Sequence, residues 1–335
     1  MYREPAEGDP LRIGILGASR IAENAIVGPA AELGHRLVAV AARNRDRAEE
    51  FAARHGVERV ARSYQEVIDD PEVEVIYNPL INSLHAQWNL AAIAAGKPVL
   101  TEKPFAANAA SAREVADAAA CSDTIILEGF HYLFHPLATR ALELLTDGRM
   151  GALTRIEVRM SMPTPPPTDP RWSYELAGGA LMDLGCYAIH VMRTFGPLAG
   201  GEPTVTGARA TVSAPQVDSA CAVDFAFPSG SATGSAWVSM TGERYDFSVN
   251  FTCTEGAIHL PDFLGPNRDN RFIVRRTGEP AVVERVDTRS TYTYQLDAFA
   301  KAVRCGAALP IGPADAVANM ELVDAAYLAA GLLPR

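Results

Sequence analysis

The sequence predicts an α/β Rossmann domain with a doubly wound parallel sheet, followed by an α+β domain with a large, mostly antiparallel sheet. Three observations predict this arrangement. Short apolar runs alternate with helical stretches up to about residue 130. The first of these runs ends in a glycine turn at Gly17. In the second half, apolar and polar residues alternate with a period of two.

The first half is typical of alternating strands and helices. Continuous apolar runs suit parallel strands that are covered on both faces, and five of them lie at Arg12–Gly17, Leu37–Ala42, Val73–Tyr77, Lys97–Thr101 and Thr124–Leu127. Between them we expect helices over Ile21–Ala31, Asp46–His55, Leu84–Ala95 and Ala109–Ala120. A Rossmann domain is therefore predicted over residues 10–130.

The second half predicts a different domain over residues 131–335. Two strands with one buried face are indicated by the alternating sets Cys221, Val223, Phe225, Phe227 and Phe247, Val249, Phe251, Cys253. Helical patterns cover Arg140–Leu145 and Asp315–Gly331. Pro163–Pro167 predicts a stiff, extended connector that is neither a helix nor a central strand.

Composition limits the classes of function. The net charge of −10 disfavours nucleic acid or an anionic membrane as a partner, because both select clustered Lys and Arg. No apolar run approaches the ~18 residues that a transmembrane helix needs. The five cysteines are odd in number and form no C-x-x-C pair. We therefore expect reduced thiols in a cytoplasmic protein, without a metal site and with a small molecule as its ligand.

Gly17-Ala18-Ser19-Arg20-Ile21-Ala22 lies where the first strand turns into the first helix. A dinucleotide-binding turn needs a glycine first and a small residue last, and Gly17 and Ala22 meet these needs. Ser19 replaces the second glycine of that pattern. An ordinary strand–helix turn is the alternative interpretation.

The end of the second strand reads Ala42-Arg43-Asn44-Arg45, without the carboxylate that usually binds an NAD ribose. A guanidinium suits a 2′-phosphate, because its planar fork makes paired, charge-assisted hydrogen bonds. Arg43, helped by Arg45, therefore predicts NADP, with NAD as the alternative cofactor. A solvated start to an exposed helix would also explain these arginines.

Two further groups of residues suggest proton chemistry. Glu102-Lys103-Pro104 follows a predicted parallel strand, and ligands gather beyond the carboxyl ends of such strands. Asp183 and Tyr187 are four residues apart, hence on one face of a predicted helix. A tyrosine hydroxyl near a lysine ammonium is a plausible proton donor to a carbonyl that receives hydride. A surface lysine and a core tyrosine are the structural alternatives.

In combination, five stretches resemble the Gfo/Idh/MocA family, which includes glucose-fructose oxidoreductase, inositol dehydrogenase and dimeric dihydrodiol dehydrogenase. The stretches are GASRIA at Gly17, YNPLINSLH at Tyr77, AGKPVLTEKPFA at Ala95, RWSYELAGGALMDLGCYAIH at Arg171 and YQLDAFAKAV at Tyr294. They occur in the family's order and span nearly the whole chain.

The resemblance implies roles for single residues. Lys103 matches the lysine between nicotinamide and substrate, Asp183 matches the family's aspartate, and Tyr187 stands where many relatives have a proton-exchanging histidine. Asn82 and His85 match positions that line the nicotinamide ribose and the substrate mouth. The expected cofactor-binding set is Gly17, Ser19, Arg20, Ile21, Ala22, Arg43, Asn44, Arg45, Pro79, Asn82, His85, Glu102 and Lys103.

The chain departs from the family at Asn78, where relatives usually have an apolar residue, and at Leu133, where they often carry arginine. Substrate contacts are expected from Arg171, Trp172, His131 and Tyr187. His135 is an open candidate, and His190 is interpreted as structural or supporting.

The resemblance implies an NADP-dependent oxidoreductase that transfers hydride to or from a sugar, polyol or cyclic diol. It also implies a homodimer or homotetramer formed through the second-domain sheet. Two alternatives remain open. One is a glycosidase that retains NAD and acts by transient oxidation, and the other is a non-catalytic dinucleotide sensor.

Overall fold

The computed structural model describes residues 8–228, 230 and 232–335. The chain forms two compact units. Unit 1 contains the chain through Phe130 together with Tyr292–Val317, and unit 2 contains His131–Thr291 and Ala318–Arg335. The sequence-based boundary at residues 130 and 131 does not anticipate that Tyr292–Val317 groups with unit 1.

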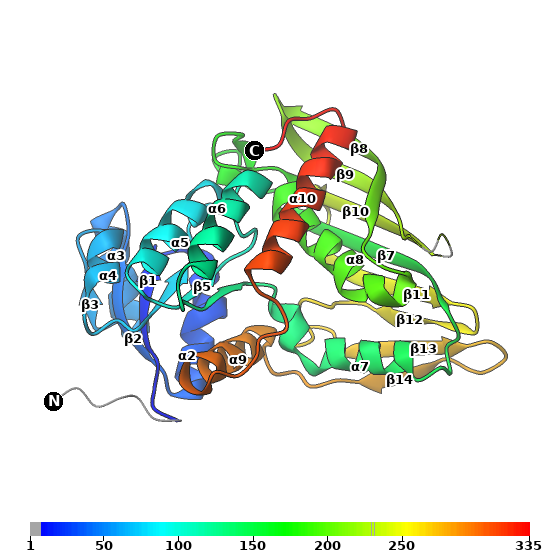
Figure 1. The fold of residues 1–335 in the computed structure, drawn as a ribbon, viewed down its shortest axis with the longest axis horizontal. Helices are drawn as coiled ribbons and strands as arrows, with labels where there is room; N and C mark the ends of the chain where they lie inside the picture. The colour runs from blue at the N-terminus through cyan, green and yellow to red at the C-terminus, as the bar shows by residue number, and fades with distance from the viewer. Residues whose placement is uncertain (1–7, 229, 231) are drawn as a thin grey trace. The chain divides into compact units, whose positions relative to one another are not determined.

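Unit 1 is built on a six-stranded parallel sheet with the strand order β3-β2-β1-β4-β5-β6 (Figure 1). Its strands are β1 (Arg12–Leu16), β2 (Arg36–Ala41), β3 (Arg59–Val60), β4 (Val75–Asn78), β5 (Val99–Thr101) and β6 (Ile126–Glu128). The order reverses direction between β1 and β4. Such a switch point, at the carboxyl ends of the strands, is where open α/β sheets bind ligands.

The helices of unit 1 follow the strands. They are α1 (Arg20–Ala22), η1 (Glu23–Val27), α2 (Gly28–Leu33), α3 (Arg45–His55), α4 (Tyr64–Asp69), η2 (Asn82–Leu84), α5 (His85–Ala94) and α6 (Ala109–Ala120), with α9 (Thr291–Cys305) contributing from Tyr292 on. The predicted Rossmann fold, with all five predicted strands and four predicted helices, is confirmed. The two-residue strand β3 and the six-residue helix α4 were not predicted, because neither is long enough to show a periodic pattern.

Unit 2 is built on an eight-stranded sheet with the order β14-β13-β12-β11-β7-β10-β9-β8 (Figure 1). Its strands are β7 (Leu153–Pro163), β8 (Thr204–Ala214), β9 (Val217–Ala226), β10 (Thr233–Gly242), β11 (Asp246–Cys253), β12 (Gly256–Leu260), β13 (Arg271–Arg276) and β14 (Val282–Arg285). Among the strands that the structure describes in this unit, only β7 and β10 pair in parallel. The prediction of a mostly antiparallel sheet is confirmed.

The predicted alternation decides which face of β9 is buried, and in β11 it holds only from Val249 on, because Phe247 is partly exposed and Ser248 is buried. Cys221, Val223 and Phe225 are buried on β9, whereas Ala222 and Asp224 are partly exposed.

The prediction for Pro163 was wrong in one respect, because Pro163 is the last residue of β7, a central strand. A proline is tolerated there because the strand ends, and the irregular connector begins only at the next residue.

Helices cover the buried face of this sheet. They are α7 (Pro136–Thr146), η4 (Pro170–Trp172), η5 (Leu181–Gly185), α8 (Cys186–Ala199) and the part of α10 (Pro313–Ala329) that belongs to unit 2, with η3 (His131–Phe134) before α7. Helix α8 packs on β7 and β10. The described residues contain no helix that is both long enough and apolar enough to cross a membrane.

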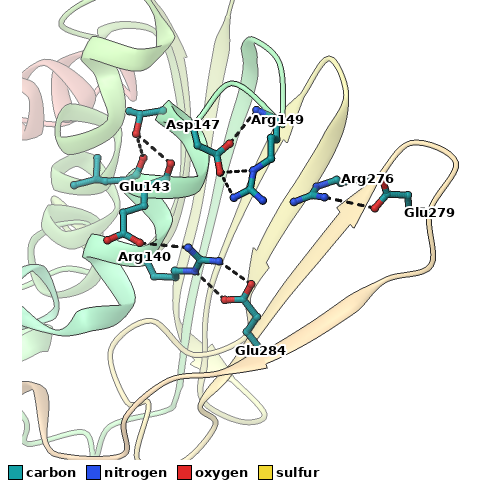
Figure 2. A network of polar contacts seen from close by, with 9 residues as sticks. Arg140, Glu143, Asp147, Arg149, Arg276, Glu279 and Glu284 are labelled. Carbon is teal, nitrogen blue, oxygen red and sulfur yellow. Dashed lines mark hydrogen bonds and ion pairs between the residues drawn. The ribbon is translucent and has the colours of Figure 1, made fainter.

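An ion-pair network fastens α7 to the outermost strand of the sheet. Figure 2 shows the Arg140 guanidinium held by both carboxylate oxygens of Glu284 on β14, at 2.8 and 2.9 Å. Arg140 also pairs with Glu143 one helical turn along, at 3.3 Å. These carboxylates raise the pKa of Arg140, with the hydrogen bond to Glu284 as the main cause. An edge strand is otherwise held on one side only, so this pair adds a second attachment.

Candidate active site

The predicted dinucleotide turn has the local geometry that such a turn needs. Gly17 adopts φ +105°, and a Cβ there would lie 3.0 Å from Leu80 Cδ2, so glycine is the residue that fits. Its N–H donates to Ala41 O on the neighbouring strand at 2.7 Å. Ala22 is fully buried under the helix that follows. A larger residue at either position would displace the turn.

The residues of this turn fit a phosphate group. Ser19 Oγ is buried and has no hydrogen-bond partner among the described residues. It stands at the start of the helical segment that begins with Arg20, and Arg20 and Ile21 are exposed in its first turn. The amino end of a helix attracts anions, and an unpaired hydroxyl beside it can donate to a phosphate oxygen. Ser19 thus offers a polar group where the glycine of the usual pattern offers space.

Three residues after β2 have different surroundings. Asn44 caps α3, with its Oδ1 accepting from the Arg47 N–H at 3.0 Å. Arg45 is held by Glu49 at 2.8 Å. Arg43 is exposed, and its guanidinium has no carboxylate partner within the described part of the chain. Of the two arginines predicted to select NADP, Arg43 is therefore the one whose charge is not neutralised locally.

A buried amide pair closes the end of β4. Asn78 is fully buried and donates from Nδ2 to Asn89 Oδ1 on α5 at 2.8 Å. The next residue, Pro79, is also buried, and Asn82 begins η2 shortly after it. The unusual Asn78 thus ties β4 to α5 just before the segment that was expected to line the nicotinamide ribose.

The loop that carries Lys103 is anchored on both sides. Before it, Glu102 Oε1 accepts from the buried hydroxyl of Tyr77 at 2.9 Å. After it, the Phe105 N–H donates to Glu128 Oε1 at 2.7 Å. Lys103 itself is half-buried. Fixed neighbours on either side hold the backbone of Lys103 in one position at the carboxyl end of β5.

His85 braces this loop against another. Its Nδ1 lies 2.6 Å from Pro104 O and its Nε2 lies 2.8 Å from Leu80 O. Burial lowers the pKa of His85, and the charge of Lys103 lowers it further. Both ring nitrogens face backbone carbonyls, and the neutral ring donates its one N–H to one of them, so the geometry gives His85 a supporting position. Its predicted place along the nicotinamide ribose stays a prediction.

Unit 2 carries the second group of candidate residues, on η5 and α8. Asp183 and Tyr187 are buried, with 7% and 4% of their surfaces exposed. Arg171 donates from Nε to Asp183 Oδ2 at 2.6 Å and also pairs with Asp169 at 3.1 Å. The charge of Asp183 is the main cause that raises the pKa of Arg171. The neighbouring Trp172 donates to Pro165 O at 3.3 Å, which fixes its indole ring.

An aromatic cluster surrounds Tyr187. The ring of His131 meets the Tyr187 ring edge-on, with centroids 5.7 Å apart, and His131 Nδ1 lies 2.7 Å from Thr291 Oγ1. On the other side, Tyr132 Oη lies 2.7 Å from His190 Nδ1, and its ring centroid lies 6.4 Å from that of Tyr187. The phenol of Tyr187 is thus enclosed by groups that exchange or share protons.

The structure separates the remaining histidine candidates. His135 is fully buried and caps α7, because its Nδ1 accepts from the Leu137 N–H at 3.1 Å. His190 contacts Tyr132, as a supporting residue would. Tyr132 and the His85 brace were missed from the sequence. Nothing in the sequence around Tyr132 indicates that its hydroxyl contacts His190, which lies 58 residues further along the chain.

The arrangement can support proton transfer and binding of a phosphorylated nucleotide. Unit 1 carries a glycine turn after β1, an exposed arginine after β2 and an anchored lysine after β5. Unit 2 brings together a buried tyrosine, an Asp–Arg pair and a histidine. Within the described residues, no three His, Cys, Asp or Glu side chains gather as metal ligands would.

Comparisons with known proteins agree with this fold. The family model GFO_IDH_MocA, described as an oxidoreductase family with an NAD-binding Rossmann fold, matches residues 11–130. The model of the GFO/IDH/MocA C-terminal domain matches residues 138–259.

Similarity to individual enzymes extends over most of the chain. D-xylose 1-dehydrogenase (NADP(+)) 2 of Haloferax volcanii is 30% identical over 319 residues, covering 95% of this chain and 96% of that enzyme. Trans-1,2-dihydrobenzene-1,2-diol dehydrogenase of Xenopus laevis is 32% identical over 280 residues, covering 80% and 82%. A 3-ketoreductase from Actinomadura kijaniata, solved in complex with NADP and TDP-benzene, has a TM-score of 0.86 at 25% identity, covering 96% and 98%.

Proposed function

Because this chain belongs to the GFO/IDH/MocA family of oxidoreductases, we propose that it transfers hydride between NADP and a hydroxyl or carbonyl group of a sugar, polyol or cyclic diol. One observation carries the substrate class. Over most of its length the chain is similar to dehydrogenases whose names specify a sugar and a cyclic diol as substrates. The exact substrate is a matter for experiment.

In this proposal the nucleotide is held by the carboxyl ends of the unit 1 strands. The turn from Gly17 to Ala22 receives the pyrophosphate, with Ser19 Oγ as an additional donor. Arg43 binds the 2′-phosphate, supported by its exposure and by the absence of a carboxylate partner among the described residues. Pro79, Asn82, Glu102 and Lys103 lie along the nicotinamide half.

The bound nicotinamide supplies or accepts the hydride. In the reducing direction Tyr187 Oη donates a proton to the carbonyl oxygen of the substrate, and in the oxidising direction it accepts that proton. Lys103 Nζ donates a hydrogen bond to the same oxygen and favours the ionised phenol through its charge. Burial of Tyr187 excludes water, which strengthens these interactions.

Asp183 supports this chemistry without exchanging a proton itself. Arg171 occupies the Asp183 carboxylate, so the role of Asp183 is to hold Arg171 at the catalytic helix. By this name we mean η5 and α8 together, which carry Asp183 and Tyr187. Trp172, whose ring is fixed by Pro165 O, offers a flat face for a sugar or an aromatic ring. His131, held edge-on to Tyr187, is the remaining proposed substrate contact.

The proposal is tested by following NADPH formation by absorbance across sugars, inositols, sugar nucleotides and cyclic diols. Turnover with at least one substrate class would support it and name the substrate. Cleavage of a glycoside without added cofactor and without net redox change would favour a hydrolase that retains NAD. Capture of a protein partner that responds to NADPH, without turnover, would favour a sensor.

We also propose that the protein forms a homo-oligomer through the exposed face of the unit 2 sheet. Trp237 lies on that sheet, half-buried, with the Arg159 guanidinium 4.7 Å from its ring centroid. Aromatic and arginine side chains are enriched where protein surfaces meet. Light scattering with Trp237→Asp beside the wild type would test this, and an unchanged mass of the variant would argue against it.

A further inference from the structure

A buried ion pair lies behind the catalytic helix of unit 2. Arg335 Nη2 is 3.1 Å from Asp218 Oδ1, and both side chains are completely buried. The guanidinium also lies over the ring of Tyr327, 4.0 Å from its centroid, and near that of Tyr174, at 5.1 Å. Neither charge belongs to the proposed proton transfer, and both are expensive to remove from water.

Both members of the pair hold the backbone that begins the catalytic helix. Asp218 Oδ2 accepts from the N–H of Leu181, the first residue of η5, at 2.7 Å. Arg335 donates from Nε to Gly178 O at 2.8 Å. Asp183 lies one helical turn after Gly179, and its N–H donates to Gly179 O at 3.0 Å. The pair therefore fixes Gly178–Leu181 from two sides, immediately before Asp183 and Tyr187.

Gly178 and Gly179 leave no room for a side chain at this point of the backbone. Gly179 has φ +121°, and a Cβ there would lie 2.2 Å from Asp218 Oδ1 and 2.7 Å from Arg335 Nη2. A Cβ on Gly178 would lie 2.4 Å from Arg171 O. A side chain at Gly179 would therefore push the ion pair away from the backbone, whereas a side chain at Gly178 would collide with the backbone of Arg171.

Asp218 depends on its partners to remain charged. Burial raises the pKa of Asp218, whereas the Leu181 N–H, Arg335 and Tyr327 each act to lower it. A buried ion pair is weak evidence for net stability, and fixing one conformation is a recognised use of such pairs. The conformation fixed here is the start of η5, which leads into α8 and Tyr187.

We propose that Arg335 is a positioning residue of the reaction, which, through Asp218 and Gly178, sets the start of the helix that carries Asp183 and Tyr187. The inference rests on the proposed function for its catalytic part. According to this inference, Arg335 affects turnover although it contacts neither substrate nor cofactor.

The test compares Arg335→Met with Arg304→Met in the full-length protein. Arg304 is a matched control, because it forms a similarly buried ion pair with Glu74, and both residues belong to unit 1, whereas Asp183 and Tyr187 belong to unit 2. Below the melting temperature of each variant, we expect Arg335→Met to lower kcat roughly 10- to 100-fold with little change in NADPH affinity. Arg335→Lys should restore part of the loss, because it keeps the charge beside Asp218. Arg304→Met should lose thermal stability and keep kcat.

A second readout does not depend on activity. Hydrogen exchange over residues 179–190 should be faster in Arg335→Met than in the wild type and unchanged in Arg304→Met. Unchanged exchange in Arg335→Met, or an equal kcat loss in both variants, would overturn the inference. If Arg335→Met shows faster exchange over residues 179–190 but the wild type shows no turnover, the result would support the positioning role of Arg335 and contradict the proposed function.

Discussion

Arg171 Nε donates a hydrogen bond of 2.6 Å to Oδ2 of Asp183, and this pair joins the loop before the catalytic helix to the helix itself. Asp183 is almost entirely buried, whereas about a third of the Arg171 side chain is exposed. The guanidinium compensates this carboxylate for part of the water that it loses on burial. The pair thus holds the segment that leads into Tyr187, four residues later.

Removing the guanidinium should destabilise the protein. We expect Arg171→Gln to lower the free energy of unfolding by about 1.5–3 kcal/mol, because Asp183 loses its charged donor. The matched control is Arg62→Gln, whose partner Glu66 lies at 3.2 Å on the exposed surface, so this variant should change the free energy of unfolding much less. Urea denaturation of both variants measures the difference, and equal losses would contradict this interpretation.

Cofactor selection should depend on Arg43. Arg43→Ala should weaken NADPH binding about 10- to 100-fold, because a charge-assisted contact to the 2′-phosphate is lost, and should leave NADH binding nearly unchanged. Arg45→Ala should have a smaller effect, since Arg45 already pairs with Glu49. Titration of nicotinamide fluorescence measures both affinities. A similar loss for both dinucleotides would show that Arg43 does not read the 2′-phosphate.

Stability should fall in mild acid, partly because of His135. Burial lowers the pKa of His135 in the folded state, whereas the unfolded histidine titrates at about 6.5. Below about pH 6.5 the unfolded state therefore binds more protons, and the free energy of unfolding decreases as the pH falls. His135→Asn keeps an acceptor for the Leu137 N–H but cannot titrate.

Thermal unfolding of wild type and His135→Asn between about pH 8 and pH 5 tests this. The variant should show a shallower decline, with the remainder due to His85, His35 and His259, whose pKa values are also lowered mainly by burial. Identical slopes in both proteins would mean that His135 does not contribute.

The amide pair of Asn78 and Asn89 gives a prediction for the end of β4. Asn78→Leu should cost about 1–3 kcal/mol of unfolding free energy, because Asn89 Oδ1 is left buried without its donor. The double variant Asn78→Leu/Asn89→Leu should recover part of that loss, since neither polar group remains. Chemical denaturation of the two single variants and the double variant measures the coupling, and simple additivity would contradict it.

Much of the fold could be predicted because its signals are local. Five of the six strands of the parallel sheet are continuous apolar runs, and β9 shows its buried face by alternation. The place of α9 in unit 1 gave no such signal. It depends on distant side-chain pairs, such as Thr293 with Glu32 and Arg304 with Glu74, and periodicity carries no information about these pairs.

Part of the candidate site could also be predicted from the sequence. The four-residue spacing of Asp183 and Tyr187 predicted one helix, and the structure places Asp183 in the π-helical turn Leu181–Gly185 and Tyr187 in α8, which follows it directly. The brace formed by His85 was not predictable, because its partners are the backbone carbonyls of Leu80 and Pro104. No residue type at those two positions indicates such a contact.

The most direct test of the central claim compares Tyr187→Phe with the wild type in NADP-linked oxidation of the best substrate. The account predicts that the variant forms NADPH roughly 10²-fold or more slowly, because the proton of the substrate hydroxyl loses its acceptor. Its affinity for NADPH should match that of the wild type. A variant as fast as the wild type would remove Tyr187 from the mechanism and contradict the account.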